Sequence, residues 1–247
     1  MTIYEPLRLG VNLDHVATLR QARFTPYPHL MEAVRIVERA GADGITLHLR
    51  EDRRHVQTED IYAAREMITT TLNLEMAATD EMTAIARDVQ PDYCCLVPER
   101  REELTTEGGL DLARHQPRLT EICQRLAAVD IKVSLFIEPT VTAIDLALKI
   151  GAPIVELHTG TYASASGAQQ VLALERIQQA AAHAADAGLQ VNAGHGLHYD
   201  NVAQIAAIPV LKELNIGHAI VARALFVGLS KAVSEMKQAM NIVRGLR

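Results

Sequence analysis

Polar side chains that can carry protons stand near the ends of short apolar runs in this sequence, and several are two residues apart. The pairs are Asn12 and Asp14, His48 and Arg50, Asn73 and Glu75, and Glu156 and His158. Residues i and i+2 of a strand share one face, so each pair is expected to point into one pocket. Charges on such a buried face must pair with one another or with a ligand. The pattern therefore predicts a site for acid–base chemistry.

Histidines are concentrated at the ends of the same runs. The five are His15, His48, His158, His195 and His218. A single strand-end histidine is often a satisfied core group, but five together predict proton carriers, because imidazole titrates near pH 7. Glu75 and Glu156 are candidates for a base and for a stabiliser of developing positive charge. Each carboxylate also has a structural interpretation, as the partner of Arg50 or of a histidine.

Glycines and arginines near these ends predict phosphate binding. Gly196 and Gly217 follow or lie within the last two runs, where a ligand can approach backbone N–H groups closely. The alternative is that both glycines only relieve crowding. Several cations follow the first two runs, namely Arg20, Arg23, Arg50, Arg53, Arg54 and His55. These cations suit phosphorylated substrates, although we expect Arg54 and Arg100 to belong to a solvated surface cluster.

A competing interpretation is a zinc site built from histidines and carboxylates. The candidate ligands are His48, Glu75, Glu156, His158 and His195. Metal-dependent barrel hydrolases usually carry His-x-His on the first strand, whereas Asn-Leu-Asp-His stands there at 12–15 in this sequence. The ligand types therefore favour a site without a metal.

The elements that would position these residues recur along the whole chain. Eight apolar runs, most of them rich in Val, Ile or Leu, have the character of buried parallel strands. They are Leu7–His15, Gly44–Leu49, Leu72–Met76, Tyr93–Val97, Val133–Glu138, Ile154–His158, Gln190–Ala193 and Glu213–Ile220. Helical spacings fill the gaps between them. Examples are Leu30, Val34 and Val37; Val171, Leu174, Ile177, Ala181 and Ala184; and a five-turn stripe at Leu225, Leu229, Val233, Met236, Met240 and Val243.

Caps and connections favour one closed architecture. Gly41, Gly151 and Gly188 are expected at left-handed helix C-caps, and Thr58 and Thr79 at N-caps. Eight alternations of strand and helix predict an α/β fold, a (β/α)8 TIM barrel forming a single domain over residues 1–247. The alternative is an open doubly wound sheet, but no GxGxxG follows the first run. In a barrel, the polar run ends would all lie at the C-terminal rim, where active sites form.

Composition excludes several other classes of protein. Among 247 residues, 24 Lys and Arg stand against 30 Asp and Glu, and a net charge of −6 argues against a nucleic-acid partner. No apolar stretch reaches the roughly 18 residues of a membrane span, and Glu5 and Pro6 stand where a signal peptide would be basic and apolar. The three cysteines, Cys94, Cys95 and Cys123, form no CxxC, so we expect buried thiols and a cytoplasmic location.

Eight segments together resemble the pyridoxine 5′-phosphate synthase family. They are GVNLDHVATLR at 10–20, HLREDRRH at 48–55, NLEM at 73–76, VPER at 97–100, TTEGG at 105–109, ELHTG at 156–160, NAGHGL at 192–197 and ELNIGH at 213–218. The combination is specific and spans nearly the whole chain. It implies a (β/α)8 barrel with extra helices, a homo-oligomer that is expected to be an octamer, and no metal or organic cofactor. The implied reaction condenses 3-amino-2-oxopropyl phosphate with 1-deoxy-D-xylulose 5-phosphate to give pyridoxine 5′-phosphate, phosphate and water, in vitamin B6 biosynthesis.

The resemblance also implies a role for each matching residue. His48 and Glu75 match the proton acceptors of the family, His195 its proton donor, and Glu156 a residue that stabilises the transition state. The matches to the aminoketone phosphate site are Asn12, Arg23, Gly196, Gly217 and His218. The matches to the deoxyxylulose phosphate site are Asp14, His15, Arg50, His55 and Thr105. As a donor, His195 would be cationic for part of the cycle, with a nearby carboxylate supporting its charge.

The residues fit this chemistry, because two phosphates need cations and glycine amides, and ring closure needs several proton transfers. A segment at 24–28 could cover the site and shield reactive intermediates from water. Two alternatives remain, a metal-dependent barrel hydrolase and a barrel that binds a sugar phosphate without turning it over.

Overall fold

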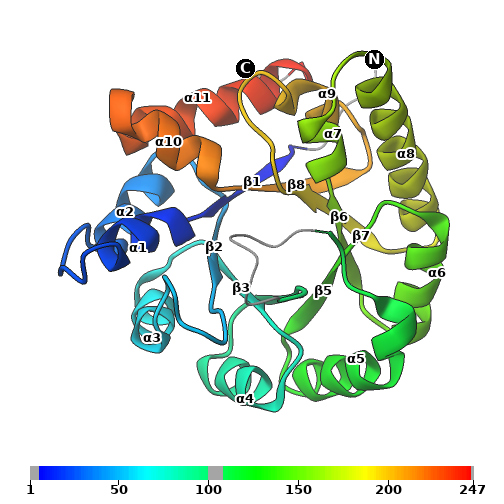
Figure 1. The fold of residues 1–247 in the computed structure, drawn as a ribbon, viewed down its shortest axis with the longest axis horizontal. Coiled ribbons are helices and arrows are strands. Elements are labelled where there is room, and N and C mark those ends of the chain that lie inside the picture. The colour runs from blue at the N-terminus through cyan, green and yellow to red at the C-terminus, as the bar shows by residue number, and fades with distance from the viewer. Residues whose placement is uncertain (1–5, 100–107, 246–247) are drawn as a thin grey trace.

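A closed barrel of parallel strands forms the centre of the molecule (Figure 1). The structure is a computed structural model, and it describes residues 6–99 and 108–245. The strands are β1 (Arg8–Asn12), β2 (Gly44–His48), β3 (Thr71–Met76), β4 (Tyr93–Leu96), β5 (Lys132–Ile137), β6 (Ile154–His158), β7 (Gln190–Gly194) and β8 (Leu211–Ile216). They pair in chain order, and β8 pairs with β1. The predicted (β/α)8 barrel is therefore confirmed, and the open doubly wound sheet is excluded.

Helices surround the barrel on its outside (Figure 1). In the described ranges they are α1 (Asp14–Gln21), α2 (Leu30–Arg39), α3 (Thr58–Met67), α4 (Asp80–Val89), α5 (Leu112–Ala127), α6 (Val141–Ile150), α7 (Gly160–Ser164), α8 (Gly167–Asp186), α9 (Val202–Ala206), α10 (His218–Val227) and α11 (Leu229–Ile242). Two helices instead of one follow β1, β6 and β8. These are the extra helices that the resemblance implied.

The strands are buried on both faces, which explains their apolar sequences. Every residue of β2 and of β6 is buried, because one face packs into the barrel and the other against helices. Ile45 and Leu47 are fully buried members of the main apolar core. Alternate positions on the same strand, such as Thr46 and His48, are buried polar residues. On β2, the barrel interior therefore receives the polar side chains, while the apolar ones pack against the helices.

Most of the expected helix ends are observed. Gly151 ends α6 with φ 88°, a left-handed conformation that favours glycine, and the Thr79 hydroxyl accepts a hydrogen bond from the Met82 amide at the start of α4. The expected N-cap at Thr58 is wrong by one residue. Gln57 caps α3 instead, because its own N–H donates to the Asp60 carboxylate at 2.8 Å in a capping box.

Two predicted strands were too long at their C-terminal ends. The first ends at Asn12, whose side-chain oxygen accepts the Asp14 N–H at 2.9 Å, a local turn that starts α1. Asp14 and His15 therefore belong to a helix and not to the strand. The eighth strand ends at Ile216, and His218 is the first residue of α10. Both changes move side chains from a strand face to a helix start at the same rim.

The predicted stripe along the C-terminal helix is interrupted. Gly228, with φ 84°, separates α10 from α11, so the stripe is not continuous over five turns. Val233, Met236 and Met240 on α11 are fully buried, as expected, but Leu225 on α10 is 70% exposed. Within the ranges that the structure describes, no helix combines the length and the apolar character needed to cross a bilayer.

Candidate active site

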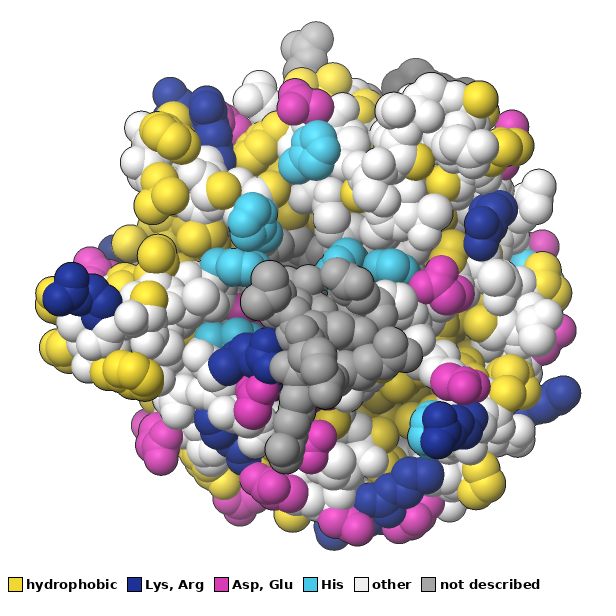
Figure 2. Space-filling model, viewed as in Figure 1, with side chains coloured by type: hydrophobic (Ala, Val, Ile, Leu, Met, Phe, Trp, Pro, Cys, Tyr) yellow, Lys and Arg dark blue, Asp and Glu magenta, His cyan; other side chains and the backbone are white. Residues whose placement is uncertain are grey.

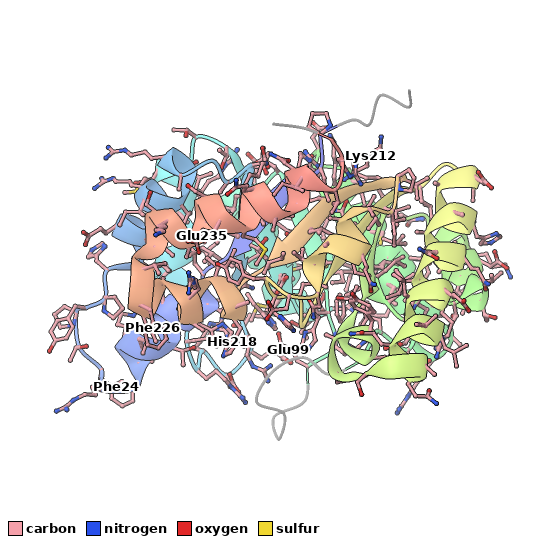
Figure 3. The ribbon with its side chains drawn as sticks, turned by 90° about the horizontal axis from the view of Figure 1, so that it is seen from above. Phe24, Glu99, Lys212, His218, Phe226 and Glu235 are labelled. Atoms are coloured by element: carbon pink, nitrogen blue, oxygen red, sulfur yellow. The ribbon has the colours of Figure 1, made fainter. Side chains whose placement is uncertain are left out.

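A cavity of about 690 Å³ opens at the C-terminal ends of the strands. Most of the predicted site residues line it: Asn12, Asp14, His15, His48, Arg50, His55, Glu75, Glu156, His195, Gly196, Gly217 and His218. Histidine side chains gather near the centre of this face in Figure 2. In Figure 3, Glu99 and His218 lie at this end of the barrel and Lys212 lies at the opposite end. The barrel thus brings together residues from both ends of the sequence.

Two predicted site residues are not placed in the cavity. Arg23 is exposed on the loop after α1 and is not among the lining residues. Thr105 lies outside the described residues. The segment at 24–28, predicted to cover the site, begins with Phe24, which Figure 3 shows at the flank of the molecule and away from Glu99. None of residues 24–28 lines the cavity. The prediction that this segment covers the site of its own chain is therefore wrong for this conformation.

His48, the last residue of β2, is held on several sides. Its Nε2 atom lies 2.9 Å from Oε1 of Glu99, its backbone N–H donates to the Asp14 carboxylate at 2.8 Å, and its Nδ1 lies 4.0 Å from Oε2 of Glu75. Burial raises the pKa of Glu99, but the hydrogen bonds from His48 and from the Glu51 backbone, together with the nearby positive charges, outweigh burial and place the pKa below its usual range. An ionised carboxylate only accepts, so Nε2 of His48 is the donor. In the neutral ring, Nδ1 then carries the lone pair and can accept a proton.

Glu75 on β3 is the carboxyl group nearest to that nitrogen among the described contacts. Burial raises its pKa well above the usual range, and the nearby carboxylates of Glu156 and Asp14 add to the effect. The ionised form of a carboxyl group with a raised pKa is a stronger base than an ordinary carboxylate. Glu75 and His48 together can therefore accept a proton from one side of the cavity.

Glu156 on β6 lies deeper and is 3% exposed. Burial raises its pKa to about 8, while a hydrogen bond from the Asn215 amide at 2.7 Å opposes that rise. The group can thus change protonation near neutral pH. It is suited to respond to a charge that develops on a bound substrate.

His195 follows β7 with a backbone φ of 81°, an unusual conformation for a residue with a side chain. Its ring packs at an angle on His158, with 5.0 Å between the ring centres. Burial lowers the pKa of His195 to about 4, and the neighbouring His158 ring adds to this. The carboxylate of Glu138 bonds to His158 at 2.9 Å and not to His195. The expected cation at His195 is therefore unfavourable in the free protein, and an anionic ligand would favour it.

Gly196 and Gly217 lie at one corner of the cavity, which we call the glycine corner. The two glycines relieve crowding there and also allow a ligand to approach the backbone. Gly217 precedes α10, a helix of ten residues whose first N–H groups can bind an anion. A side chain at Gly217 would overlap Asn12, and one at Gly196 would overlap Ala163. The glycines therefore do relieve crowding, and by the same absence of side chains they leave the backbone accessible at the cavity wall. His218 packs its ring on His15 at 4.9 Å beside this corner.

Cations that follow β2 line another part of the cavity. Arg50 is 2% exposed and its Nε lies 3.5 Å from an Asp52 oxygen, while Arg54 pairs with the same carboxylate at 2.6 Å. Arg54 was expected in a surface cluster, but it lines the cavity. The ring of His55 lies 6.0 Å from that of His48. This wall can bind an anionic group.

One group of potential metal ligands exists among the described residues, and it differs from the predicted set. It consists of Asp14, His48 and Glu75, whose ligand atoms lie within 4.8 Å of one another. Asp14 already accepts hydrogen bonds from the His48 amide and from the Asn12 side chain at 2.8 Å each. His158 and His195, which were also considered, are not part of the group.

Four residues that support the predicted ones were given no role in the sequence interpretation. Glu99 holds His48, Glu138 holds His158, and Thr46 and Asn215 belong to the polar interior next to Glu156. Thr46 stands two residues before His48, so the period of a strand could have indicated it. Glu99 and Glu138 lie just after strands, and their partners come from other strands, which spacing cannot predict.

Known proteins resemble this chain in sequence and in fold. The family model described as "Pyridoxal phosphate biosynthesis protein PdxJ" matches residues 9–242. A curated "Pyridoxine 5′-phosphate synthase" of Thioalkalivibrio sulfidiphilus is 64% identical over 245 residues, which are 99% of this chain and 100% of that protein.

Solved structures with low identity show the barrel fold alone. One titled "Native KDPGal structure" has a TM-score of 0.64 at 14% identity and covers all of both chains. The phosphoribosyl anthranilate isomerase of Thermus thermophilus has a TM-score of 0.61 at 12% identity, over 95% of this chain and 98% of that one. The match of the family model over nearly the whole sequence is decisive. The chain therefore belongs to the pyridoxal phosphate biosynthesis protein PdxJ family.

Proposed function

We propose that this chain is an enzyme that condenses 3-amino-2-oxopropyl phosphate with 1-deoxy-D-xylulose 5-phosphate to give pyridoxine 5′-phosphate, phosphate and water. The observation that carries the proposal is the 64% identity over full length to a curated pyridoxine 5′-phosphate synthase. The cavity supports it, since twelve of the fourteen site residues implied by the resemblance line one space of about 690 Å³.

The proton-transfer groups are proposed to divide between two sides of the cavity. His48 and Glu75 accept protons on one side, because His48 directs Nδ1 toward Glu75 and the pKa of Glu75 is raised by burial. His195 donates on the other side once an anionic substrate has raised its pKa from about 4. Glu156 stabilises the positive charge that develops as the ring forms.

The two phosphates are proposed to bind at two separate places. Gly196, Gly217 and His218, together with Asn12, bind the aminoketone phosphate near the start of α10. The wall with Arg50 and His55, together with Asp14 and His15, binds the deoxyxylulose phosphate. Arg23 and Thr105 are proposed to complete these sites. A liganded structure with its phosphates far from both glycines would contradict the first assignment.

A turnover assay tests the function directly. Both substrates are mixed with the purified protein, and the pyridine chromophore and the released phosphate are measured. Formation of both in equal amounts supports the proposal. Binding without turnover would support a sugar-phosphate-binding barrel instead. Activity lost on chelation and restored by zinc, with Asp14, His48 and Glu75 as the ligands, would support a metal-dependent hydrolase.

We also propose that the chain forms a homo-oligomer, an octamer by the resemblance. Large apolar side chains are exposed on α1, the loop after it and the end of α10, and Figure 2 shows hydrophobic side chains along this side. We call this surface the apolar flank; its residues are Leu19, Phe24, Tyr27, Leu225 and Phe226. Phe24 and Phe226, each 85% exposed, lie at the same side of the molecule in Figure 3. Contiguous exposed apolar surface of this kind is typical of protein interfaces. Sedimentation of the protein at several concentrations tests the state.

Location and domain structure complete the proposal. We infer a cytoplasmic enzyme, because Cys94, Cys95 and Cys123 are free and buried thiols of the kind that a reducing compartment maintains. A single domain over the whole chain is supported by one core cluster whose members run from Leu7 to Met240. We expect no membrane and no nucleic acid among the partners, only the phosphorylated substrates.

A further inference from the structure

Three buried side chains connect across the barrel interior to Glu156. The Asn73 amide lies 3.5 Å from the Thr46 hydroxyl, which lies 3.0 Å from the Asn215 side-chain oxygen. The Asn215 amide nitrogen then donates to Oε2 of Glu156 at 2.7 Å. Exposure is 0% for Thr46 and below 10% for the other three residues. These contacts therefore run through β3, β2, β8 and β6 between side chains that are largely buried.

The contacts have one consistent direction. Asn73 donates from an amide N–H, so the Thr46 oxygen is its acceptor and the single Thr46 proton is available for Asn215. Asn215 receives that proton on its carbonyl oxygen. This fixes the orientation of the amide, whose N–H group must then face Glu156. In this series of three hydrogen bonds, each residue donates to the next one in the direction of the Glu156 carboxylate.

Two glycines make room for this arrangement. Gly10 pairs in register with Asn215, and a side chain at Gly10 would overlap the Asn215 carbonyl oxygen. Gly194 pairs with Asn215 on the other side, and a side chain there would overlap Oε1 of Glu156. The backbone on both neighbouring strands is thus shaped around the Asn215–Glu156 pair.

We propose that Thr46 and Asn215 are positioning residues, which hold Oε2 of Glu156 as a hydrogen-bond acceptor and leave Oε1 as the oxygen that takes up and releases a proton. This inference rests on the proposed function of Glu156 in the condensation reaction. Neither residue touches the reacting atoms in this role. They act by directing one N–H group at one oxygen of the Glu156 carboxyl group, a contact that favours the ionised form and opposes the effect of burial.

Other groups also influence the charge of Glu156. Glu213 on β8 raises its pKa, and Glu156 in turn raises the pKa values of Glu75 on β3 and Cys95 on β4. The residues in register with Glu156 on β5 and β7 are Phe136 and Asn192, which do not titrate. Among these described neighbours, Asn215 is the one whose contact favours the ionised form. Loss of its orientation must therefore raise the pKa of Glu156.

Thr46→Val is the principal test, because valine has the shape of threonine without the hydroxyl. Without the Thr46 proton, the Asn215 amide can turn its carbonyl oxygen to Glu156, and that oxygen is satisfied only by a protonated carboxyl group. We expect the apparent pKa of Glu156 to rise by about one unit and kcat to fall roughly 10-fold, with KM nearly unchanged. Thr46→Ser keeps the hydroxyl and should restore both. Asn215→Asp, which places a second carboxyl group against Oε2, should raise the pKa in the same direction.

Ser134→Ala is the matched control, since Ser134 is a buried hydroxyl on β5 outside this chain of contacts. It should leave the pH profile unchanged. The pKa of Glu156 is read by carbon NMR of protein labelled at the glutamate carboxyl carbon, with Glu156→Gln assigning the signal, so the readout does not depend on turnover. An unchanged Glu156 pKa in folded Thr46→Val and Asn215→Asp proteins would overturn the proposal. A wild-type protein that shows the titration but makes no product would instead refute the proposed function.

Discussion

The Nε2 atom of His48 lies 2.9 Å from Oε1 of Glu99, and both side chains are at most 6% exposed. Glu99 also accepts the Glu51 backbone N–H at 3.0 Å, so its orientation is held independently of His48. The pair determines which nitrogen of His48 carries the proton. It thereby directs the lone pair of Nδ1 toward Glu75.

Glu99→Gln should therefore lower kcat with little effect on folding. The new amide N–H can donate to Nε2, which moves the ring proton to Nδ1 and removes the lone pair from the reacting side. A change of tautomer of this kind should reduce kcat by about 10²-fold or more. Steady-state kinetics with both substrates measure the effect, and thermal unfolding checks the fold. Glu81→Gln, which loses only an exposed ion pair with Arg53, is the control. Normal kcat in the Glu99 variant would show that this carboxylate does not orient His48.

Glu75→Gln tests the second proposed proton acceptor. Glutamine keeps the shape and polarity of the side chain but cannot accept the proton. Because burial and neighbouring carboxylates already raise the pKa of Glu75, a neutral amide should fit its surroundings without loss of stability. We expect kcat to fall about 10²-fold or more while substrate binding is retained. If the variant unfolds, or if its activity survives, the carboxylate is structural or dispensable.

His195→Asn should leave binding nearly intact and reduce turnover sharply. Asparagine tolerates a positive φ better than most residues, so the backbone at 81° is retained. It keeps a polar group but cannot transfer the proton. The acid limb of the pH–rate profile should change, since His195 has a pKa near 4 before substrate binds. Near-normal kcat with an unchanged profile would leave His48 as the remaining histidine candidate for proton transfer.

The same variant has a predicted effect on stability. The pKa of His195 is about 4 in the folded protein and about 6.5 when unfolded, so the unfolded state binds an extra proton between these values. Stability is then complete above pH 6.5 and is lost as the pH falls toward 4. Urea unfolding measures the free energy of unfolding at pH 7 and at pH 4.5. We expect the decrease between these two pH values to be about 2 to 3 kcal/mol smaller in His195→Asn than in the wild-type protein. His115→Asn, at an exposed position of α5, is the control and should change the loss much less.

Arg23→Ala tests a residue that the structure places outside the cavity of its own chain. It should raise the KM for the aminoketone phosphate more than for the sugar phosphate, by about 1.5 to 3 kcal/mol. Arg35→Ala, on the exposed side of α2, is the control. Unchanged kinetics with both substrates would show that Arg23 is a solvated surface residue that does not bind substrate.

A mixing experiment shows how Arg23 reaches the substrate. Arg23→Ala and Glu75→Gln proteins are unfolded together and refolded as mixed oligomers. If Arg23 binds substrate in the cavity of a neighbouring copy, mixed oligomers contain some complete sites. Their activity at low substrate concentration should then exceed the sum of the activities of the two variants. If the loop instead closes on its own chain, a mixed oligomer shows no gain over the sum of the two variants.

The fold and most members of the site follow from the amino-acid pattern alone. Runs such as Ile154–His158 are apolar enough to be buried on both faces, and eight of them alternating with helices leave few arrangements other than a barrel. A barrel brings the C-terminal ends of all its strands to one rim, so polar residues at those ends had to meet. This is why His48, Glu75 and His195 could be grouped without knowledge of any distance.

Which atoms face each other depends on the folded barrel and could not be predicted from the pattern. Asn12 turned the chain into α1 and moved Asp14 from a strand face to a helix start, because a side-chain hydrogen bond over two residues competed with the strand pattern. Glu99 follows β4 and bonds to His48 on β2, and Asn215 on β8 bonds to Glu156 on β6. Spacing along the sequence carries no information about such contacts. The protonation of each buried group depends on these neighbours and on exclusion of water. Both are properties of the closed barrel, and a strand-by-strand description of the sequence does not contain them.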